Sequence, residues 1–400
     1  MKRKKNNYFF LFFLILGLPL FCLPKNLEKD FVKASLSGKS DIIKALSDAD
    51  RLFALKMAFD FAISNSSLLC DDAEFNDFLL DCVSSIPSDE NEISKISDSD
   101  QKKISEKLME VFNAFTSPEL RHIIMDKLCL YSVGTDGTMV SFLNDYLSSA
   151  FEAEEEGQNI LPSAIELTGK IGDSNSLSII HTIWKSKIWL EHKNIIDEAL
   201  VLLTEDSFSD AIRIFSTSSF DDAATYFSLL AKSSKINQNS LCEIAENALL
   251  IAINNAEKLE AEETDAKKSL SSFVIEATSI LCDARWSHAA NVVLSSLILS
   301  KEFYEDGVLS AEDFSRIIKS SANIPSQKIS ELYNQMLSDC NGIVEKDGKM
   351  PARGVVLALI EGLGELGEKS SFDTLLYVTY LSYPPEIVEA AKKSLALLKW

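Results

Sequence analysis

Three segments far apart in this chain share one residue pattern. IELTGKIGD begins at Ile165, IEATSILCD at Ile275 and IEGLGELGE at Ile360. Each starts with Ile-Glu, has Gly or Ser at the fifth place and Ile or Leu at the seventh, and ends on Gly or Cys before an acid. The spacings of 110 and 195 residues are close to three and five units of about 37–39 residues. A recurrence of this kind indicates a chain that stacks one supersecondary unit several times.

A second pair of segments supports the repeat. SPELRHIIMDKLCLY begins at Ser117, and YPPEIVEAAKKSLALL begins at Tyr383. Both place Pro-Glu at the start of an apolar helical pattern. A proline in the first turn of a helix loses no hydrogen bond, and the following glutamate is stabilised by the helix dipole. Both segments are therefore predicted to begin helices at the same place in the repeat.

The composition favours helices joined by short loops. Among 400 residues there are 14 glycines and 9 prolines, fewer than the many turns of a sheet protein need. Apolar residues recur every three or four positions after the N-terminal segment, which is the period of an amphipathic helix. We expect helices at 101–115, 118–133, 137–154, 160–172, 176–188, 192–204, 208–217, 220–233, 240–261, 265–282, 287–303, 310–322, 326–340, 351–366, 371–382 and 385–398.

Local signals mark several helix ends. The S-x-x-[DE] spacing at Ser219, Ser240 and Ser310 predicts side-chain caps at helix starts. Gly364 and Gly367 close an apolar pattern, and glycine readily takes the positive φ of a C-terminal cap. We therefore expect both glycines to end one helix before the chain reverses.

Residues 350–400 resemble the HEAT-repeat family in its short bacterial form. They contain the L-G-x-L-G-[DE] ending, a leucine pair in the next helix, and then P-E-[IV]-x-x-A-A-x-x-[SA]-L. The last motif is matched by Pro385, Glu386, Ile387, Ala390, Ala391, Ser394 and Leu395. Val388 stands where the family often has arginine. The resemblance extends to 158–204, 117–155 and 265–304, whereas 205–270 match only as generic helix pairs. It implies an all-α fold, an α-solenoid of antiparallel helix pairs.

The N-terminus has the pattern of an export signal. A basic stretch, MKRKKNN, precedes an apolar run from Tyr8 to Leu23, which is shorter than a membrane span. We expect a signal peptide at 1–22 and an exported protein, periplasmic or associated with the envelope. An uncleaved anchor is the alternative, and Cys22 allows a lipid anchor although Phe21 is bulky for a lipobox. An N-terminal helical cap (23–83), an acidic linker (84–100) and the HEAT-like array (101–400) follow.

The net charge of the chain limits the classes of partner that we expect. The formal net charge is −21, so phosphate backbones and anionic lipid surfaces are repelled, and no nucleic-acid partner is expected. Contact with a membrane is expected only through the signal segment or a lipid on Cys22. A protein is the expected partner.

The usual chemistry-bearing motifs are absent from the sequence. Its four histidines make no H-E-x-x-H, and its seven cysteines make no C-x-x-C pair. There is neither a G-x-S-x-G elbow nor a phosphate-binding P-loop. We expect no catalytic residue, no metal and no cofactor, and we expect the protein not to be an enzyme. The cysteines are expected to lie separately in helix cores.

One stretch is basic and aromatic, although the chain as a whole is acidic. HTIWKSKIWLEHK, from His181 to Lys193, gathers two tryptophans, three lysines and two histidines. Aromatic residues are enriched where proteins bind each other, so Trp184, Lys185, Lys187 and Trp189 are the candidate partner-binding residues. The alternative is that both tryptophans belong to the core. If the stretch is a partner site, we expect Trp184 at the edge of a buried stripe and Trp189 in the turn before the next helix, where a large apolar side chain is harder to bury.

These patterns together predict a non-enzymatic, exported scaffold of HEAT-like repeats that binds another protein. Stacked helix pairs offer extended surfaces that suit such binding. Two alternatives remain: a structural component of an envelope, secretion or motility machine, and a repeat protein that assists an enzyme.

Overall fold

The computed structural model describes residues 25–131, 137–153, 160–256, 258–259 and 263–399. The expected signal peptide and Cys22 lie outside these residues. Within them, no helix combines the length and apolarity that crossing a membrane requires.

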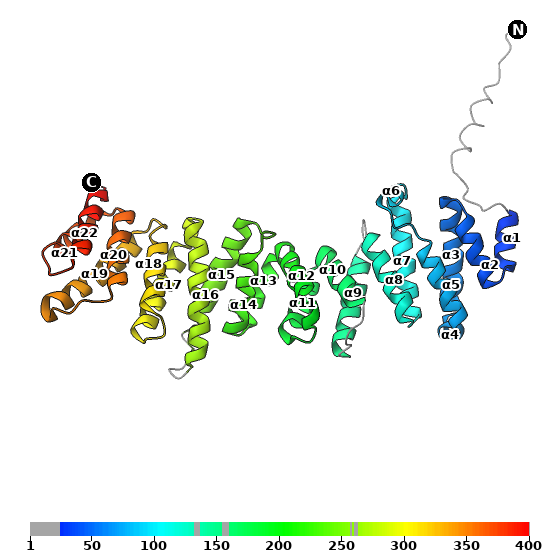
Figure 1. The fold of residues 1–400 in the computed structure, drawn as a ribbon, viewed down its shortest axis with the longest axis horizontal. Coiled ribbons are helices and arrows are strands. Elements are labelled where there is room, and N and C mark those ends of the chain that lie inside the picture. Colours follow the sequence, from blue (N-terminus) through cyan, green and yellow to red (C-terminus); the bar gives the residue numbers. More distant parts are fainter. Residues whose placement is uncertain (1–24, 132–136, 154–159, 257, 260–262, 400) are drawn as a thin grey trace, which may run out of the picture. The chain divides into compact units, whose positions relative to one another are not determined.

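The described residues form helices and no strands. The chain divides into two compact units, Met1–Ile171 (unit 1) and Gly172–Trp400 (unit 2). Figure 1 labels their helices. The all-helical class expected from the periodicity is confirmed for this part of the chain.

Among the described residues, unit 1 contains helices α1 to α10. They are α1 (Lys25–Lys33), α2 (Leu36–Ala45), α3 (Asp48–Ser64), α4 (Ser66–Leu69), α5 (Ala73–Ser84), α6 (Glu90–Ile93), α7 (Asp98–Ala114), α8 (Pro118–Leu130), α9 (Gly137–Glu152) and α10 (Ile160–Ile171). Helices α3, α7 and α9 contact one another in succession, as do α2, α5, α8 and α10. Contacts such as those of α7 with α8 and of α9 with α10 join the two successions.

Unit 2 contains the remaining helices. They are α11 (Ser174–Ser186), η1 (Leu190–His192), α12 (Lys193–Asp206), α13 (Phe208–Thr217), α14 (Phe220–Lys232), α15 (Gln238–Ala256), α16 (Thr264–Asp283), η2 (Ser287–Ala289), α17 (Ala290–Glu305), α18 (Ala311–Ser321), α19 (Gln327–Asp347), α20 (Arg353–Leu366), η3 (Lys369–Ser371), α21 (Phe372–Val378) and α22 (Pro385–Leu397).

Helices of unit 2 alternate between two rows. The first row runs α11, α13, α15 and α17, and the second runs α12, α14, α16, α18, α20 and α22, each helix contacting the next in its row. Helices α19 and α21 contact each other and lie against α20 and α22. Fully buried leucines and isoleucines such as Leu249, Leu281, Ile318 and Leu359 make up the core. This alternation is compatible with an α-solenoid.

From α7 onward the helices occur where the periodicity predicts them, with three notable differences in length. Helix α15 ends at Ala256 instead of 261. Helix α19 continues to Asp347, beyond the expected end at 340, and Gly348 closes it with a φ of +59°. Helix α21 ends at Val378 instead of 382. Among the caps, Ser219 and Ser310 accept the expected backbone hydrogen bonds, from Asp222 N and Asp313 N.

The expected cap at Ser240 is wrong, because α15 begins two residues earlier, at Gln238. The Asn237 side chain takes the capping position, and its Oδ1 accepts from the Ser240 backbone N–H at 2.9 Å. Asparagine is as good an N-cap as serine, so the local pattern alone did not decide between the two.

The glycines near residue 364 serve two different purposes. Gly367 is the C-cap of α20 with a φ of +70°, as expected. Gly364 is not a cap, contrary to expectation, because it lies inside α20 and is buried. A Cβ at Gly364 would lie 2.8 Å from Ser394 Cβ and 3.0 Å from Ser394 Cα. Gly364 therefore allows α20 and α22 to approach closely.

Residues 84–100, the expected linker, are packed against the helices of unit 1. They include α6, and α7 begins within them at Asp98. Ile86, Pro87 and Ile93 are buried, and the Lys127 ammonium donates to the Ile86 carbonyl. That residues 84–100 separate two domains stays a prediction. The boundary between the two compact units lies after Ile171.

Candidate functional site

The predicted basic and aromatic stretch spans the turn between α11 and α12. Lys187 ends α11 in the left-handed conformation, with a φ of +59°. Trp184 is half-buried and donates from Nε1 to Asp197 Oδ1 at 3.0 Å. Its ring stacks on His181 with centroids 5.7 Å apart. Trp184 thus lies at the edge of the buried region, as expected.

Trp189 does not lie where the sequence predicted. Its side chain is 1% exposed, so the expectation of an exposed tryptophan in this turn is wrong. The backbone reverses at Lys187, and the Trp189 side chain is enclosed by the fold although it precedes η1. A tryptophan buried to this extent offers no surface to a partner. A position in a turn does not reveal which distant segments fold over it, so a core position for Trp189 stood only as the alternative in the sequence analysis.

Carboxylates neutralise most of the positive charge in this stretch. Lys185 pairs with Asp222 of α14 at 3.0 Å, and Lys193 pairs with Asp197 of α12. Burial opposes ionisation of Asp222, but hydrogen bonds from Lys185 and Ser219 leave the pKa of this carboxyl below its usual value. Asp222 lies far from Lys185 in the sequence, so composition alone did not reveal the pairing. Trp184, Lys185 and Lys187 remain surface residues, and their role in partner binding stays a prediction.

An aromatic cluster continues from Trp184 into the core of unit 2. Tyr226 lies 5.5 Å from His181 and 5.1 Å from Phe215, measured between ring centroids. Phe227 and Phe273 meet edge to face at 5.2 Å. The Tyr226 hydroxyl is buried against the Thr204 hydroxyl, and burial raises its pKa. This arrangement is typical of a packed core that aromatic edges and faces stabilise.

His181 is the titratable member of this cluster. Burial lowers the pKa of its imidazole, and the nearby Lys185 ammonium lowers it further. Its Nε2 is buried and has no hydrogen-bond partner among the described residues. A neutral imidazole is therefore favoured in the folded protein.

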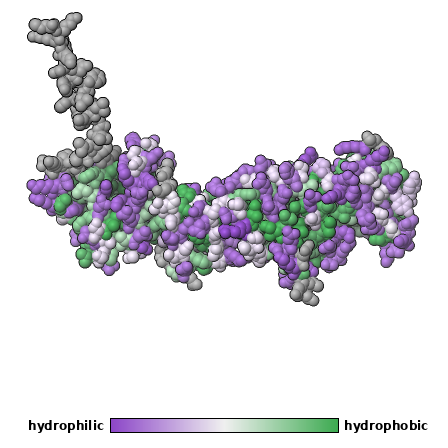
Figure 2. Space-filling model, turned by 180° about the vertical axis from the view of Figure 1, so that it is seen from behind, coloured by the Kyte–Doolittle hydropathy of each residue, from purple (hydrophilic) through white to green (hydrophobic). Residues whose placement is uncertain are grey.

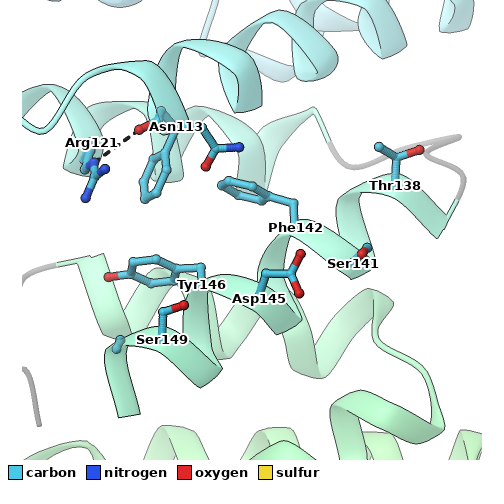
Figure 3. Close-up of a pocket in the computed structure, with 10 residues that line it drawn as sticks. Asn113, Arg121, Thr138, Ser141, Phe142, Asp145, Tyr146 and Ser149 are labelled. Carbon is cyan, nitrogen blue, oxygen red and sulfur yellow. Dashed lines mark hydrogen bonds between the residues drawn. The ribbon is translucent and has the colours of Figure 1, made fainter. Parts of the chain in front are cut away.

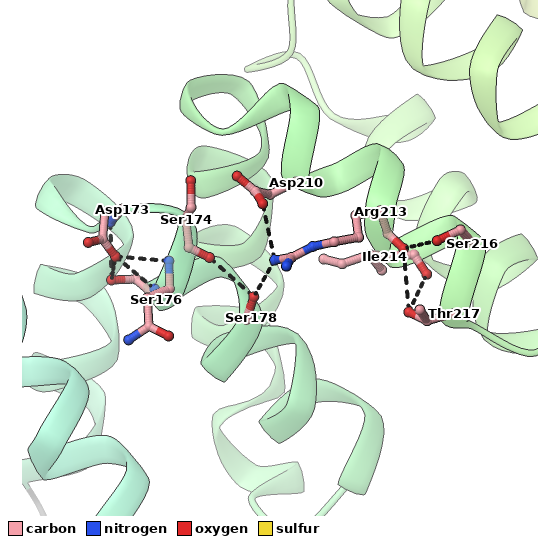
Figure 4. A network of polar contacts seen from close by, with 10 residues as sticks. Asp173, Ser174, Ser176, Ser178, Asp210, Arg213, Ile214, Ser216 and Thr217 are labelled. Carbon is pink, nitrogen blue, oxygen red and sulfur yellow. Dashed lines mark hydrogen bonds and ion pairs between the residues drawn. The ribbon is translucent and has the colours of Figure 1, made fainter.

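A polar network joins α11 to α13 (Figure 4). The Arg213 guanidinium lies 3.0 Å from Asp210 and 3.5 Å from the Ser178 hydroxyl. That hydroxyl donates to the Ser174 carbonyl at 3.2 Å. The contact between Arg213 and Ser178 therefore links two neighbouring helices of the first row.

A hollow of about 470 Å³ opens between α7, α8 and α9 in unit 1 (Figure 3). Side chains of α9, including Asp145 and Tyr146, line one side, and Arg121 lies on the other. Arg121 Nε donates to the carbonyls of Phe112 (3.2 Å) and Phe115 (2.8 Å), and its guanidinium lies 4.8 Å from the Phe112 ring centroid. Arg121 therefore satisfies carbonyls at the C-terminal end of α7.

Neither a metal centre nor an activated thiol is evident in the described part of the chain. No three His, Cys, Asp or Glu residues there are grouped so that they could hold a metal ion. The described cysteines are all free. Burial raises the pKa of Cys282 to about 12 and those of Cys129 and Cys340 to about 11. A protonated thiol is a poor nucleophile and a poor metal ligand.

Exposed apolar side chains occur on α15 and α17, two helices of unit 2 that contact each other. We call Leu250 and Ile253 of α15, with Leu294 and Ile298 of α17, the α15–α17 apolar surface. Leu250 and Ile298 are each 44% exposed, and Ile253 and Leu294 are half-buried. Within each helix the two side chains are three or four residues apart and so share a face. Figure 2, which views the molecule from behind, shows hydrophobic surface gathered over the central helices of unit 2.

Comparison with protein families, with characterised proteins and with solved structures finds no match to this chain. The fold alone therefore indicates the structural class of the protein. It is all-helical in its described residues, and its helix packing is compatible with an α-solenoid.

Proposed function

We propose that this protein is an exported, non-enzymatic scaffold of HEAT-like repeats that binds another protein. The observation that carries the proposal is the α15–α17 apolar surface, exposed on neighbouring helices of a strongly acidic chain. The recurrence of the Ile165, Ile275 and Ile360 segments supports the repeat.

The exposed apolar side chains favour a protein partner. Isolated apolar residues are common on protein surfaces, whereas a group of them rimmed by polar residues is typical of an interaction site. Asn247 and Asn254 flank the surface on α15, and Asn291 and Lys301 flank it on α17. An apolar centre with a polar rim is the usual organisation of a protein–protein interface.

Affinity capture with the full-length chain from its native envelope tests the proposal. We expect one protein to copurify at a fixed ratio and to be lost with the double variant Leu250→Asp/Ile298→Asp. Leu397→Asp is the matched control, because Leu397 is 58% exposed but lies on α22 of the second row. The melting temperatures of all variants should stay close to that of the wild type.

Two results would contradict this proposal. If Leu397→Asp abolishes capture as completely as the double variant, the α15–α17 apolar surface is not the site. If a small molecule or a chromophore copurifies in place of a protein, a repeat protein that assists an enzyme is the better description. A partner present in many copies per chain would favour the structural role in an envelope machine.

The surface formed by Trp184, Lys185 and Lys187 is proposed as a secondary contact. Lys187 is exposed, and no ion pair to it is found within the described residues. The variant Lys187→Glu should weaken capture only if this surface contacts the partner.

Export is proposed from the basic and apolar N-terminal sequence. Mass spectrometry of the protein from the native cell should find a mature N-terminus near residue 22. A lipid on Cys22 would raise the mass and hold the protein at a membrane. A cytoplasmic product that still begins at Met1 would overturn the proposal of export.

A further inference from the structure

A second hollow in unit 1 combines an apolar lining with several basic residues. It has a volume of about 790 Å³ and lies along α3, the segment 86–97 and the first turns of α7. We call it the α3–α7 groove. Its lining includes Leu52, Phe53, Phe59, Ile86, Ile96 and Ile104. Its size is that of a small-molecule site, since such pockets span about 300–1,000 Å³ and are mostly apolar.

The rim of the α3–α7 groove has the opposite charge from the protein as a whole. Four basic residues line it, namely Arg51, Lys56, Lys95 and Lys103, against the two acids Glu92 and Asp100. Lys103 pairs with Asp100 at 3.0 Å. Lys56 and Lys95 are exposed, and neither makes an ion pair within the described residues. A local excess of positive charge in a chain of net charge −21 favours an anionic group at this rim.

Buried hydrogen bonds hold the wall of the groove in place. The Lys127 ammonium of α8 donates to the Ile86 carbonyl and to the Ser88 hydroxyl. The Tyr131 hydroxyl donates to the Pro87 carbonyl at 3.0 Å. Gln101 Nε2 donates to the carbonyls of two residues in the same segment, Ile93 (3.2 Å) and Ile96 (3.0 Å). A wall fixed in this way is formed before any ligand arrives, which lowers the entropic cost of binding.

The shape of the groove selects the class of ligand. Helices α3 and α7 contact each other directly, so a partner helix about 10–12 Å in diameter does not fit between them. The stretch of α3 from Arg51 to Phe59 is about 12 Å long, which suits an extended hydrocarbon chain of moderate length.

We infer that the α3–α7 groove binds an anionic amphiphile, with its hydrocarbon chain on the apolar floor and its carboxylate beside Lys56 and Lys95. The hydrocarbon chain of the ligand covers Phe53, Ile96 and Ile104 and removes them from water. The ammonium groups of the two lysines compensate the charge of the carboxylate. The groove shares no residue with the α15–α17 apolar surface, so this inference does not depend on the proposed function.

Calorimetric titration of the full-length protein with decanoate tests the inference. Decanol and decyltrimethylammonium have the same hydrocarbon tail but a neutral and a cationic head. We expect decanoate to bind one to one and more tightly than either. The double variant Lys56→Glu/Lys95→Glu should weaken decanoate binding by about tenfold or more, because it replaces both attractive charges by repulsive ones.

Two sets of variants control for indirect effects. Lys328→Glu/Lys349→Glu changes the net charge equally but lies in unit 2, so decanoate binding should be unchanged. Ile104→Trp and Leu52→Trp each place a larger side chain on the floor and should abolish binding by filling it. If either tryptophan variant lowers the melting temperature, the charge-reversal variant, whose changes are both exposed, decides the question.

Three outcomes would overturn the inference. The first is no binding of decanoate to the wild type. The second is equal affinity for decanoate and decanol together with no loss in the charge-reversal variant, since the head group is then not recognised. The third is tight binding of an acidic amphipathic helical peptide that decanoate does not displace, which would assign the groove to a protein ligand.

Discussion

Gly364 and Gly367 stand close together in the sequence but meet different requirements. Gly367 needs a positive φ, which costs a residue with a side chain about 1–2 kcal/mol. Gly364 has no such need, and its missing side chain makes room for Ser394 of α22. The same substitution should therefore destabilise the protein for different reasons at the two positions.

We expect Gly364→Ala to destabilise the protein by about 1–3 kcal/mol, because the new methyl group forces α20 and α22 apart. Gly367→Ala should cost about 1–2 kcal/mol through backbone strain. Denaturant unfolding monitored by circular dichroism measures both changes.

A double-mutant cycle distinguishes the two mechanisms. Ser394→Gly removes the two Ser394 atoms nearest to the new methyl group, so it should recover part of the stability lost in Gly364→Ala. It should recover none of the loss in Gly367→Ala. If the effects of Gly364→Ala and Ser394→Gly are simply additive, the close approach does not limit this site.

His181 predicts a dependence of stability on pH. Its pKa is lowered in the folded state relative to the value of about 6.5 in the unfolded chain. The folded protein therefore binds fewer protons, so this contribution to stability is complete above pH 6.5 and is lost as the pH falls through the folded pKa. Trp184, Tyr226, Lys185 and Asp222 surround the imidazole.

Melting temperatures measured between pH 7.5 and pH 5 check this prediction. The wild type should lose more stability on acidification than His181→Gln, which cannot take up the proton. His122→Gln, on α8, is the control for the loss of a histidine as such. Parallel curves for the wild type and His181→Gln would show that His181 does not contribute to the slope.

At the scale of secondary-structure elements, the turn between α11 and α12 depends on a buried tryptophan. Trp189 is nearly inaccessible, whereas Trp184 keeps part of its ring in water. Truncating Trp189 leaves a cavity, so Trp189→Ala should destabilise the protein by about 3–5 kcal/mol. Trp184→Ala should cost less. Denaturant unfolding of the two variants tests this order, and a loss below that of Trp184→Ala would contradict the burial of Trp189.

Segment 84–100 depends on a buried lysine of another helix. Lys127 is enclosed, and burial lowers the pKa of its ammonium group. Lys127→Ala leaves the Ile86 carbonyl without this donor, which should cost about 1–3 kcal/mol. Amide hydrogen exchange in residues 86–96 should become faster.

Lys95→Ala is the matched control for this prediction, since Lys95 lies in the same segment and is exposed. It should leave both stability and exchange unchanged. Unaltered exchange in Lys127→Ala would mean that Tyr131 and Gln101 hold the segment without the lysine.

At the scale of the whole molecule, the thiols report on the integrity of the fold. Cys82, Cys242 and Cys282 are buried, and burial raises the pKa of each. A raised pKa keeps a thiol protonated at pH 8, so these three should react with Ellman's reagent only after unfolding. Peptide mapping of the labelled native protein checks this expectation. Rapid labelling of Cys282 in the native state would contradict the packing of α16.

The sequence alone was sufficient to place the helices and many of their ends. The hydrogen bonds and side-chain periodicity of a helix involve residues no more than about four positions apart. A cap such as Ser310 or a left-handed glycine such as Gly367 is equally local. For this reason the all-helical class and most helix ranges were predicted correctly from the residues themselves.

Only the tertiary structure decided which side chains are free to bind. Trp189 is buried and Lys185 is neutralised because segments distant in the sequence fold against them. The space beside Gly364 is set by Ser394 of another helix. The α3–α7 groove likewise joins residues about fifty positions apart, such as Lys56 and Ile104, and no pattern within either segment contains it. Burial, charge pairing and cavities depend on how helices pack, and local periodicity does not determine that packing.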